Sequence, residues 1–358
     1  MSSGAVAGSR SVALPSRWAR PGRRALLVVA SAAVLVGSLL LGVLVGPAGL
    51  TPGAVLASLA GAVPGVGTAS GLSSQQEAIL WQIRLPRVVL GALVGAMLAL
   101  AGAAYQGVFR NPLADPYLLG VSSGAGLGAT LAIVSGGVLA GLGLPVVAFL
   151  GGLLGVAATY ALGSSVGRGA RSSVVIVLAG VAVAAFLNAI QTFVQQRYDE
   201  SLRSVYSWLL GRLSTQGWSE VLTVLPYVVL ASVVILLHRR VLDVMAVGDT
   251  EARSLGVDAT RTRLVLVLAA TLGTAAVVSV SGLIGFVGIV VPHAVRLLLG
   301  GSHRVLLPVS MLLGAAFLVG ADILARTVMS PAELPIGVVT ALVGAPFFVV
   351  VLRRARMT

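Results

Sequence analysis

The chain has 358 residues, of which 57% are hydrophobic and 10% are charged, and its mean hydropathy of +1.02 lies outside the range of soluble domains. It contains no cysteine, which excludes disulfides and thiolate metal sites. All 24 basic residues are arginine, so the chain lacks the lysine with which a Walker A loop reaches nucleotide phosphates. Arginines retained in cytoplasmic loops explain the net charge of +13 better than nucleic-acid binding does.

The first 24 residues contain five arginines and no acidic residue, and we expect residues 1–24 to form a disordered cytoplasmic tail. The next run, residues 25–46, has no charge and is long enough to cross the hydrocarbon core, which takes about 20 residues. This run is longer than the apolar core of a signal peptide, and no convincing cleavage site follows it. It predicts an uncleaved first span that starts on the cytoplasmic side.

Apolar runs of similar length recur to the C-terminus, without the alternation of apolar and polar residues that marks a transmembrane β-barrel. We therefore predict an all-α polytopic membrane protein with about ten transmembrane helices, organised as a single domain over residues 25–358. An even number of spans puts both termini in the cytoplasm of a bacterial cell. The predicted spans are residues 25–46, 88–107, 118–138, 143–164, 174–195, 220–238, 263–283, 285–299, 305–326 and 334–352.

The segment before the second predicted span, residues 81–87, has arginines on either side of a proline at the level of the outer headgroups. Two roles are consistent with Trp81, Arg84 and Arg87. An aromatic ring and two long cationic side chains can anchor a helix at the interface. The same arginines can instead present a cationic patch to an acidic partner, and the residue types alone do not separate these alternatives.

Small and polar residues mark the interior of several predicted spans. Pairs of glycines four residues apart predict close helix packing in lipid. In the fifth span, Asn188 and Gln191 lie three residues apart on one helical face, where they either bond to a neighbouring helix or line a water-filled path. Ser172 and Ser173 precede this helix, where they either cap it or mark a constriction.

The longest predicted cytoplasmic segment, residues 239–262, lies between the sixth and seventh spans and contains the charged stretch GDTEARSLGV at 248–257. Asp249 or Thr250 can cap a short helix that ends before Gly256. A second short helix with an apolar face precedes it. Two short helices with exposed apolar and charged groups predict a projection that docks a partner protein.

Few other polar residues fall within the predicted spans. Asp322 and Arg326 lie four residues apart in the ninth span, where they either pair on one helix face or leave Arg326 free for a partner. His293 has no second histidine, serine or acid close to it in the sequence, so we expect a hydrogen-bonded structural residue, and neither a metal site nor a catalytic set. The residues around Gly102 and Gly282 match weakly as an inverted repeat, which is typical of transporters.

Four stretches, in their order and spacing, resemble the permease subunits of FecCD-type ABC importers, the branch for iron siderophores, haem and cobalamin. They are residues 82–129, 248–257, 285–308 and 321–354, and they cover most of the chain from residue 80 on. The resemblance implies the type II importer permease fold, with ten helices per subunit. It also implies partners: a second permease in a homodimer or a related pair, two cytoplasmic ATPase subunits, and an extracytoplasmic substrate-binding protein.

The same resemblance implies roles for particular residues. The cytoplasmic loop would contact the ATPase, the arginines at the outer end would meet acidic residues of the binding protein, and the serines before the fifth span would form the inner gate. The implied ATPase-coupling residues are Gly248, Asp249, Glu251, Ala252, Leu255 and Gly256, the docking residues are Arg84, Arg87 and Arg326, and the gate residues are Ser172 and Ser173. Asn188 and Gln191 are the predicted residues of the translocation path.

We therefore predict a transporter subunit that imports an iron chelate, with a ferric siderophore as first choice and haem or cobalamin as alternatives. We expect the chain to bind no cofactor, no metal and no nucleic acid, and ATP and Mg²⁺ to bind the partner ATPase. An ion-coupled secondary transporter is the rival hypothesis. It needs a buried ionisable site at the midplane, for which Asp322 beside an arginine is weak support.

Overall fold

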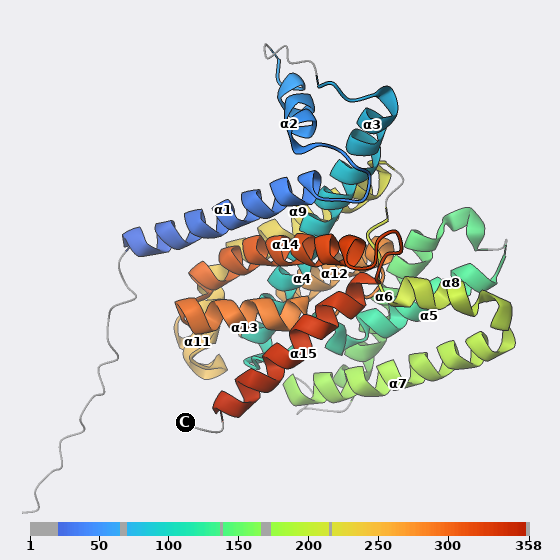
Figure 1. Cartoon of the computed structure of the whole chain (residues 1–358). Coiled ribbons are helices and arrows are strands. Elements are labelled where there is room, and N and C mark those ends of the chain that lie inside the picture. The colour runs from blue at the N-terminus through green and yellow to red at the C-terminus, as the bar shows by residue number, and fades with distance from the viewer. Residues whose placement is uncertain (1–20, 65–69, 137–138, 166–172, 215–216, 356–358) are drawn as a thin grey trace, which may run out of the picture.

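The computed structural model describes residues 21–64, 70–136, 139–165, 173–214 and 217–355, and within these ranges the chain is helical and has no strand (Figure 1). The all-α prediction is confirmed for this part, while the predicted tail, up to residue 20, lies outside it. The α-helices are α1 (Pro21–Leu44), α2 (Pro52–Gly61), α3 (Ser74–Ala78), α4 (Leu85–Phe109), α5 (Val121–Val134), α6 (Leu144–Ser165), α7 (Ser173–Arg197), α8 (Leu202–Leu209), α9 (Ser219–Leu237), α10 (Arg239–Met245), α11 (Asp249–Ser254), α12 (Ala259–Ser281), α13 (Val287–Leu299), α14 (His303–Thr327) and α15 (Ile336–Ala355).

Seven helices in the described ranges are long and apolar enough to cross a membrane. One of them runs without a break from α3 through a π-helical turn (Ile79–Arg84) into α4, and the others are α1, α6, α7, α9, α12 and α14. The three further predicted spans correspond to α5, α13 and α15, whose apolar stretches are shorter. The structure therefore supports a polytopic helical membrane protein, and the number of ten spans stays a prediction.

Irregular backbone precedes α5 and α13, which explains why both helices are short. A 3₁₀ turn (Pro116–Leu119) enters α5 through Gly120, whose φ of 84° favours glycine, and Asp115 caps this turn by accepting from the N–H of Tyr117 at 2.7 Å. The Tyr117 hydroxyl also donates to the carbonyl of Ile284 and accepts from its N–H, each at 3.1 Å, just before α13. Such backbone is tolerated inside a membrane protein where other protein groups satisfy it.

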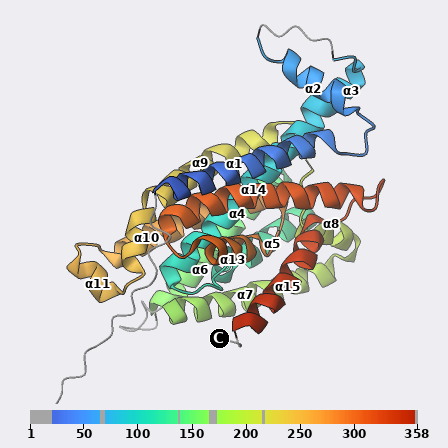
Figure 2. The ribbon, with the colours of Figure 1, turned by 60° about the vertical axis from the view of Figure 1, so that its left-hand side comes forward.

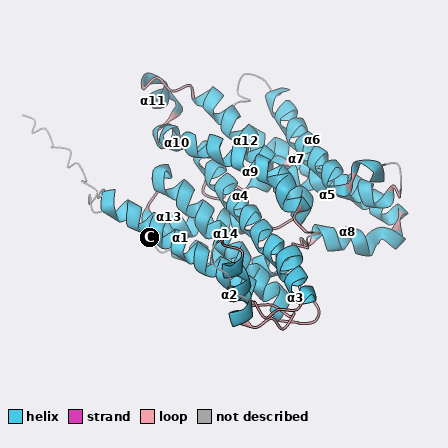
Figure 3. Cartoon of the chain, turned by 90° about the horizontal axis from the view of Figure 1, so that it is seen from above, coloured by secondary structure: helices cyan, strands magenta, loops and turns pink. Residues whose placement is uncertain are grey.

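Helix α4 is the centre of the bundle, packing against α14, α12, α13 and α9 (Figure 3). Its contacts with α14 and α13 are backbone to backbone. A Cβ atom on Gly95 would overlap the carbonyl oxygen of Gly314, and one on Gly102 would overlap that of Gly288. Since lipid tails are as apolar as the side chains, such close van der Waals contact replaces the hydrophobic effect as the force that joins these helices.

Helices α5 and α6 pack together in the same way. Added Cβ atoms on Gly124 and Gly151 would each overlap the other residue's carbonyl oxygen, and one on Gly155 would overlap that of Gly120. The close packing predicted for glycines four residues apart is thus confirmed at Gly151 and Gly155.

The two ends of the bundle carry different short helices (Figure 2). Helices α2 and α3 lie at one end, and α10 and α11 project at the opposite end. Helix α1 packs along α14, α7 packs on α6 and α5, and α15 crosses α13 and α14. We refer below to the α2–α3 end as the outer end and to the α10–α11 end as the inner end, following the predicted orientation.

The backbone contact at Gly102 predicts that a large side chain there destabilises the fold. Gly102→Leu should lower the stability of the purified protein by about 1–3 kcal/mol or prevent folding, because overpacking forces the backbones apart. Gly37→Leu is the matched control, since an added Cβ on this α1 residue meets nothing within 4 Å. Thermal unfolding followed by size-exclusion chromatography measures both variants, and equal stability of the two would contradict the packing argument.

Candidate functional site: an outer charged cluster, an amide-lined cavity and an inner projection

The outer end of the bundle holds a charged cluster around Asp322 of α14. The Arg87 guanidinium pairs with Asp322 at 2.8 Å and with Glu333 at 2.8 Å, and Arg326 pairs with Asp322 at 3.3 Å. Of the two alternatives for Asp322 and Arg326, the structure shows the pair on one helix face. The contributions of Arg87 and Glu333 were not predicted, because Arg87 lies more than 200 residues before both acids and meets them only in the folded bundle.

Two of the three predicted docking arginines are buried. Arg84 is 4% exposed and Arg326 is 3% exposed, and they donate to the carbonyls of Val43 at 3.1 Å and Gly42 at 2.6 Å. These carbonyls belong to the last turn of α1, where the helix itself supplies no N–H partner. The expectation that all three arginines form an exposed patch is therefore wrong for this structure, in which only Arg87 reaches the surface, and there it is paired with an acid.

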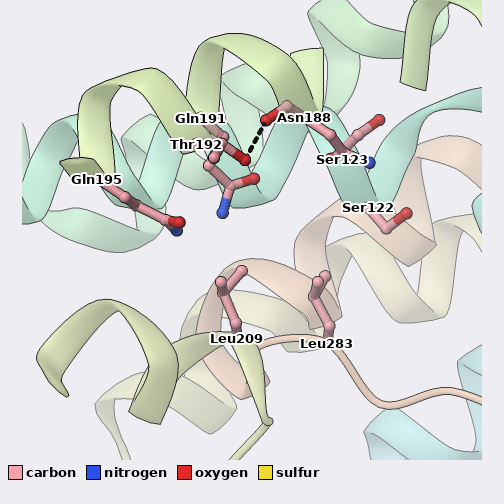
Figure 4. Close-up of a pocket in the computed structure, with 8 residues that line it drawn as sticks. All are labelled: Ser122, Ser123, Asn188, Gln191, Thr192, Gln195, Leu209 and Leu283. Carbon is pink, nitrogen blue, oxygen red and sulfur yellow. Dashed lines mark hydrogen bonds between the residues drawn. The ribbon is translucent and has the colours of Figure 1, made fainter. Parts of the chain in front are cut away.

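A polar cavity of about 330 Å³ lies beside α7 (Figure 4). Asn188 and Gln191 both line it, as their shared helical face predicted, and Gln195 extends the same face by one turn. Gly126 of α5 makes room for the Gln191 amide, which lies 3.1 Å from where a Cβ atom would stand. The residues that line the cavity are Ser122, Ser123, Asn188, Gln191, Thr192, Gln195, Leu209 and Leu283.

Ser122 and Ser123 of α5 were not identified from the sequence, although they lie two and three residues after the turn at Gly120. Only the packing of α5 on α7 brings them to the cavity. Of the two predicted gate residues, Ser172 lies outside the described residues, and Ser173 is described by its backbone alone, as the first residue of α7. The gate therefore stays a prediction.

The inner projection consists of α10 and α11. Asp249 does not cap α11 as expected: the N-cap is Gly248, with φ 147°, and Asp249 is the first helical residue. Its carboxylate instead pairs with Arg110 at the end of α4 and, at 3.1 Å, with Arg263 in α12. The predicted stop at Gly256 is confirmed by its φ of 79°.

The surface of the projection differs in part from the prediction. Ala252 is fully buried and packs the inside of the projection, so its expected place in a partner contact is not available in this structure. Leu255 is 68% exposed and Val247 is 70% exposed, while Glu251 is also exposed at the same end. Two large apolar side chains beside a carboxylate form a surface suited to a protein partner.

Helix α10 is tied to the start of α14 by Asp243. Its carboxylate accepts from the backbone N–H of His303 at 2.6 Å and from Ser302 at 3.0 Å, and lies 3.0 Å from Nδ1 of His303. Burial acts to raise the pKa of Asp243, but the hydrogen bonds from the side chain and backbone of His303 outweigh it and hold the pKa below its ordinary value. The carboxylate therefore stays charged at neutral pH and secures α10 to α14.

No group of three or more histidine, cysteine or acidic side chains that could hold a metal occurs in the part of the chain that the structure describes. His293 packs edge-on against Phe347 with ring centroids 6.3 Å apart. Its Nδ1 is buried and has no hydrogen-bond partner among the described residues, so the expected hydrogen bond at this nitrogen is absent.

Comparisons with known proteins place this geometry in a family. The FecCD transport family matches residues 34–354. The chain is 46% identical over 283 residues to the cobalamin import system permease protein BtuC of Halobacterium salinarum. The matched region covers 79% of this chain and 75% of the relative. It is 40% identical over 282 residues to the hemin transport system permease protein HmuU of Yersinia pestis, with 77% and 84% coverage.

Two further comparisons are consistent with this family. The Fe(3+) dicitrate transport system permease protein FecD of Escherichia coli is 40% identical over 278 residues, covering 78% of this chain and 86% of that protein. A solved metal-chelate type ABC transporter in an inward-facing conformation superimposes with a TM-score of 0.78 at 30% identity, over 92% of this chain and 99% of that chain.

The cavity beside α7 predicts a difference in water accessibility along exposed helix surfaces. Asn188→Cys should react with a membrane-impermeant thiol reagent, because this residue lines the polar cavity. Leu230→Cys on α9 is the control, since Leu230 is 56% exposed but apolar neighbours surround it in sequence. The chain has no native cysteine to confuse the labelling. A cysteine at 188 that reacts no faster than one at 230 would show that the cavity is closed to water.

The two ion pairs of Asp249 predict that this residue holds α11 in place. In Asp249→Asn, hydrogen exchange of the α11 amides should become about two- to thirtyfold faster, because two exposed ion pairs are lost and each contributes about 0.2–1 kcal/mol. Glu251→Gln removes the same charge from the same helix without breaking an observed ion pair and should leave exchange unchanged. Equal exchange in both variants would mean that backbone packing alone fixes α11.

Proposed function

The chain belongs to the FecCD transport family, and we propose from that premise that it carries a ferric siderophore across the cell membrane. It is the permease of a type II ABC importer for an iron chelate, haem, cobalamin or a similar substrate, and it is a transporter component and not an enzyme. The names of its relatives include cobalamin, hemin and Fe(3+) dicitrate. Haem and cobalamin are accordingly the alternatives to a siderophore.

The inner projection is the observation that supports an ATP-driven mechanism. Leu255 and Val247 expose apolar surface on it, and two carboxylates connect it to the membrane helices: Asp249 to α4 and α12, and Asp243 to α14. A partner that binds this surface can therefore transmit its movement to three membrane helices, α4, α12 and α14. In the proposal, ATP and Mg²⁺ bind to two cytoplasmic ATPase subunits that dock here, and the chain itself binds no cofactor.

The proposal includes two further partners. A second permease, identical or related, would complete the path beside α7, where Asn188 and Gln191 supply polar groups without charge. An extracytoplasmic binding protein would deliver the substrate at the outer end, where Arg87 and Glu333 are the accessible members of the charged cluster. Both termini would then lie in the cytoplasm, with Ser172 and Ser173 at the inner gate.

The rival hypothesis of an ion-coupled transporter fits the charged cluster less well. Such a transporter needs a buried acid that can exchange a proton or cation. Asp322 is buried, but arginines flank both of its oxygens, Arg87 at 2.8 Å and Arg326 at 3.3 Å. A carboxylate held between two fixed cations is a structural group.

Leu255→Asp tests the proposed function. Co-purification of the ATPase with the permease should weaken at least about tenfold, because loss of a central apolar contact typically costs about 2 kcal/mol. Uptake of radioactive ferric siderophore by liposomes that contain permease, ATPase and binding protein should fall with it. Val63→Asp is the control, since Val63 is also exposed but follows α2 at the opposite end. Normal ATPase binding by a folded Leu255→Asp variant would refute the docking proposal.

A further inference from the structure

A second polar pocket of about 350 Å³ lies at the outer end, next to α8. Helix α8 and the turn after it supply four polar side chains, and the end of α5 and the start of α6 supply two aliphatic ones, Ile133 and Leu144. The polar residues are Arg203, Ser204, Ser207 and Arg212.

The polar groups of this pocket are all able to donate hydrogen bonds. Arg203, Ser204 and Ser207 share one face of α8 by their three- and four-residue spacing. Neither Arg203 nor Arg212 forms an ion pair with an acidic residue of the described chain. Trp208 also lines the pocket, and its indole N–H is buried without a hydrogen-bond partner in the described part of the chain. A pocket without an acid and with two free guanidinium groups complements an oxyanion.

A carboxylate is the oxyanion that suits this arrangement. A guanidinium group binds it through two parallel hydrogen bonds, and serine hydroxyls can donate to its remaining lone pairs. Arg203 and Arg212 are both exposed to solvent and line the same pocket, so an acidic group that enters it would meet two cations, whereas an uncharged ligand would gain no ionic contact.

The position of the pocket links it to the cavity beside α7. Trp208 lines the pocket, and its neighbour Leu209 lines the amide-lined cavity, so adjacent residues of α8 face the two spaces. A ligand held by Arg203 and Arg212 would therefore lie against the same short helix that borders the proposed path.

We propose that Arg203 and Arg212, with Ser204 and Ser207, bind a carboxylate of the transported chelate, so that the importer prefers iron chelates with net negative charge. This inference rests on the proposed function and narrows its substrate class. It distinguishes the outer pocket from the amide-lined cavity, which contains no charged group.

The test compares two ferric probes, the anionic ferric citrate and an uncharged ferric trihydroxamate. Their binding to the purified permease–ATPase complex is measured by equilibrium dialysis with radioactive iron. In Arg203→Gln/Arg212→Gln, the Kd for ferric citrate should rise at least about tenfold, because each lost charge-assisted hydrogen bond contributes about that factor. Binding of the uncharged probe should not change. Arg197→Gln is the matched control, since Arg197 is exposed at the outer end of α7 but does not line the pocket.

Several results would overturn the inference. They are no saturable binding of ferric citrate by the wild-type complex, an equal loss of both probes in the double variant, or an equal effect of Arg197→Gln. Thermal stabilisation of the wild type, but not of the double variant, by phosphatidylglycerol without any by ferric citrate would assign the pocket to a lipid headgroup. Uptake of the uncharged chelate by reconstituted liposomes, without ferric citrate binding, would refute this inference and leave the proposed function standing.

Discussion

The backbone contacts of α4 with α13 and α14 constrain the rest of the structure. Gly95 and Gly102 bring this helix so close to Gly314 and Gly288 that no side chain fits between them. In lipid, where apolar side chains gain little from leaving their surroundings, this close approach supplies the van der Waals contact that holds helices together. The consequence is a tightly packed centre from which cavities and charges are displaced to the periphery and to the two ends.

Helix α4 has an arginine in an ion pair near each of its ends. Near its outer end Arg87 binds Asp322, and at its inner end Arg110 binds Asp249 of the projection. Helix α14 has the same arrangement, with Asp322 toward the outer end and His303 bound to Asp243 at the inner end. Since these two helices also share the glycine contact, a displacement of the projection acts directly on the central pair. This connection gives the proposed ATP-driven movement a physical route across the membrane.

Two polar cavities border α7 or α8, and Figure 4 shows the one that Asn188 and Gln191 line. The surfaces of α7 are less buried than those of α4, and the amides of Asn188 and Gln191 provide polarity without the cost of a charge in the membrane. Of these two cavities, only the outer pocket is lined by charged residues, Arg203 and Arg212, and both are exposed to water. The division between a packed centre and a polar, open side is what a permease needs to hold its shape while it passes a large solute.

The sequence by itself determined the helical class, the glycine packing, the four-residue spacing that lets Asp322 pair with Arg326, and the shared face of Asn188 and Gln191, because each depends on local periodicity or on residues within about one turn of a helix. Tertiary structure decided the rest. Only helix packing brings Arg87 to Asp322, Ser122 to the α7 cavity, and Arg263 to Asp249. The burial of Arg84 and Arg326 was likewise not predictable, since it depends on unpaired carbonyls at the end of α1, a helix distant in sequence that meets them only in the folded bundle.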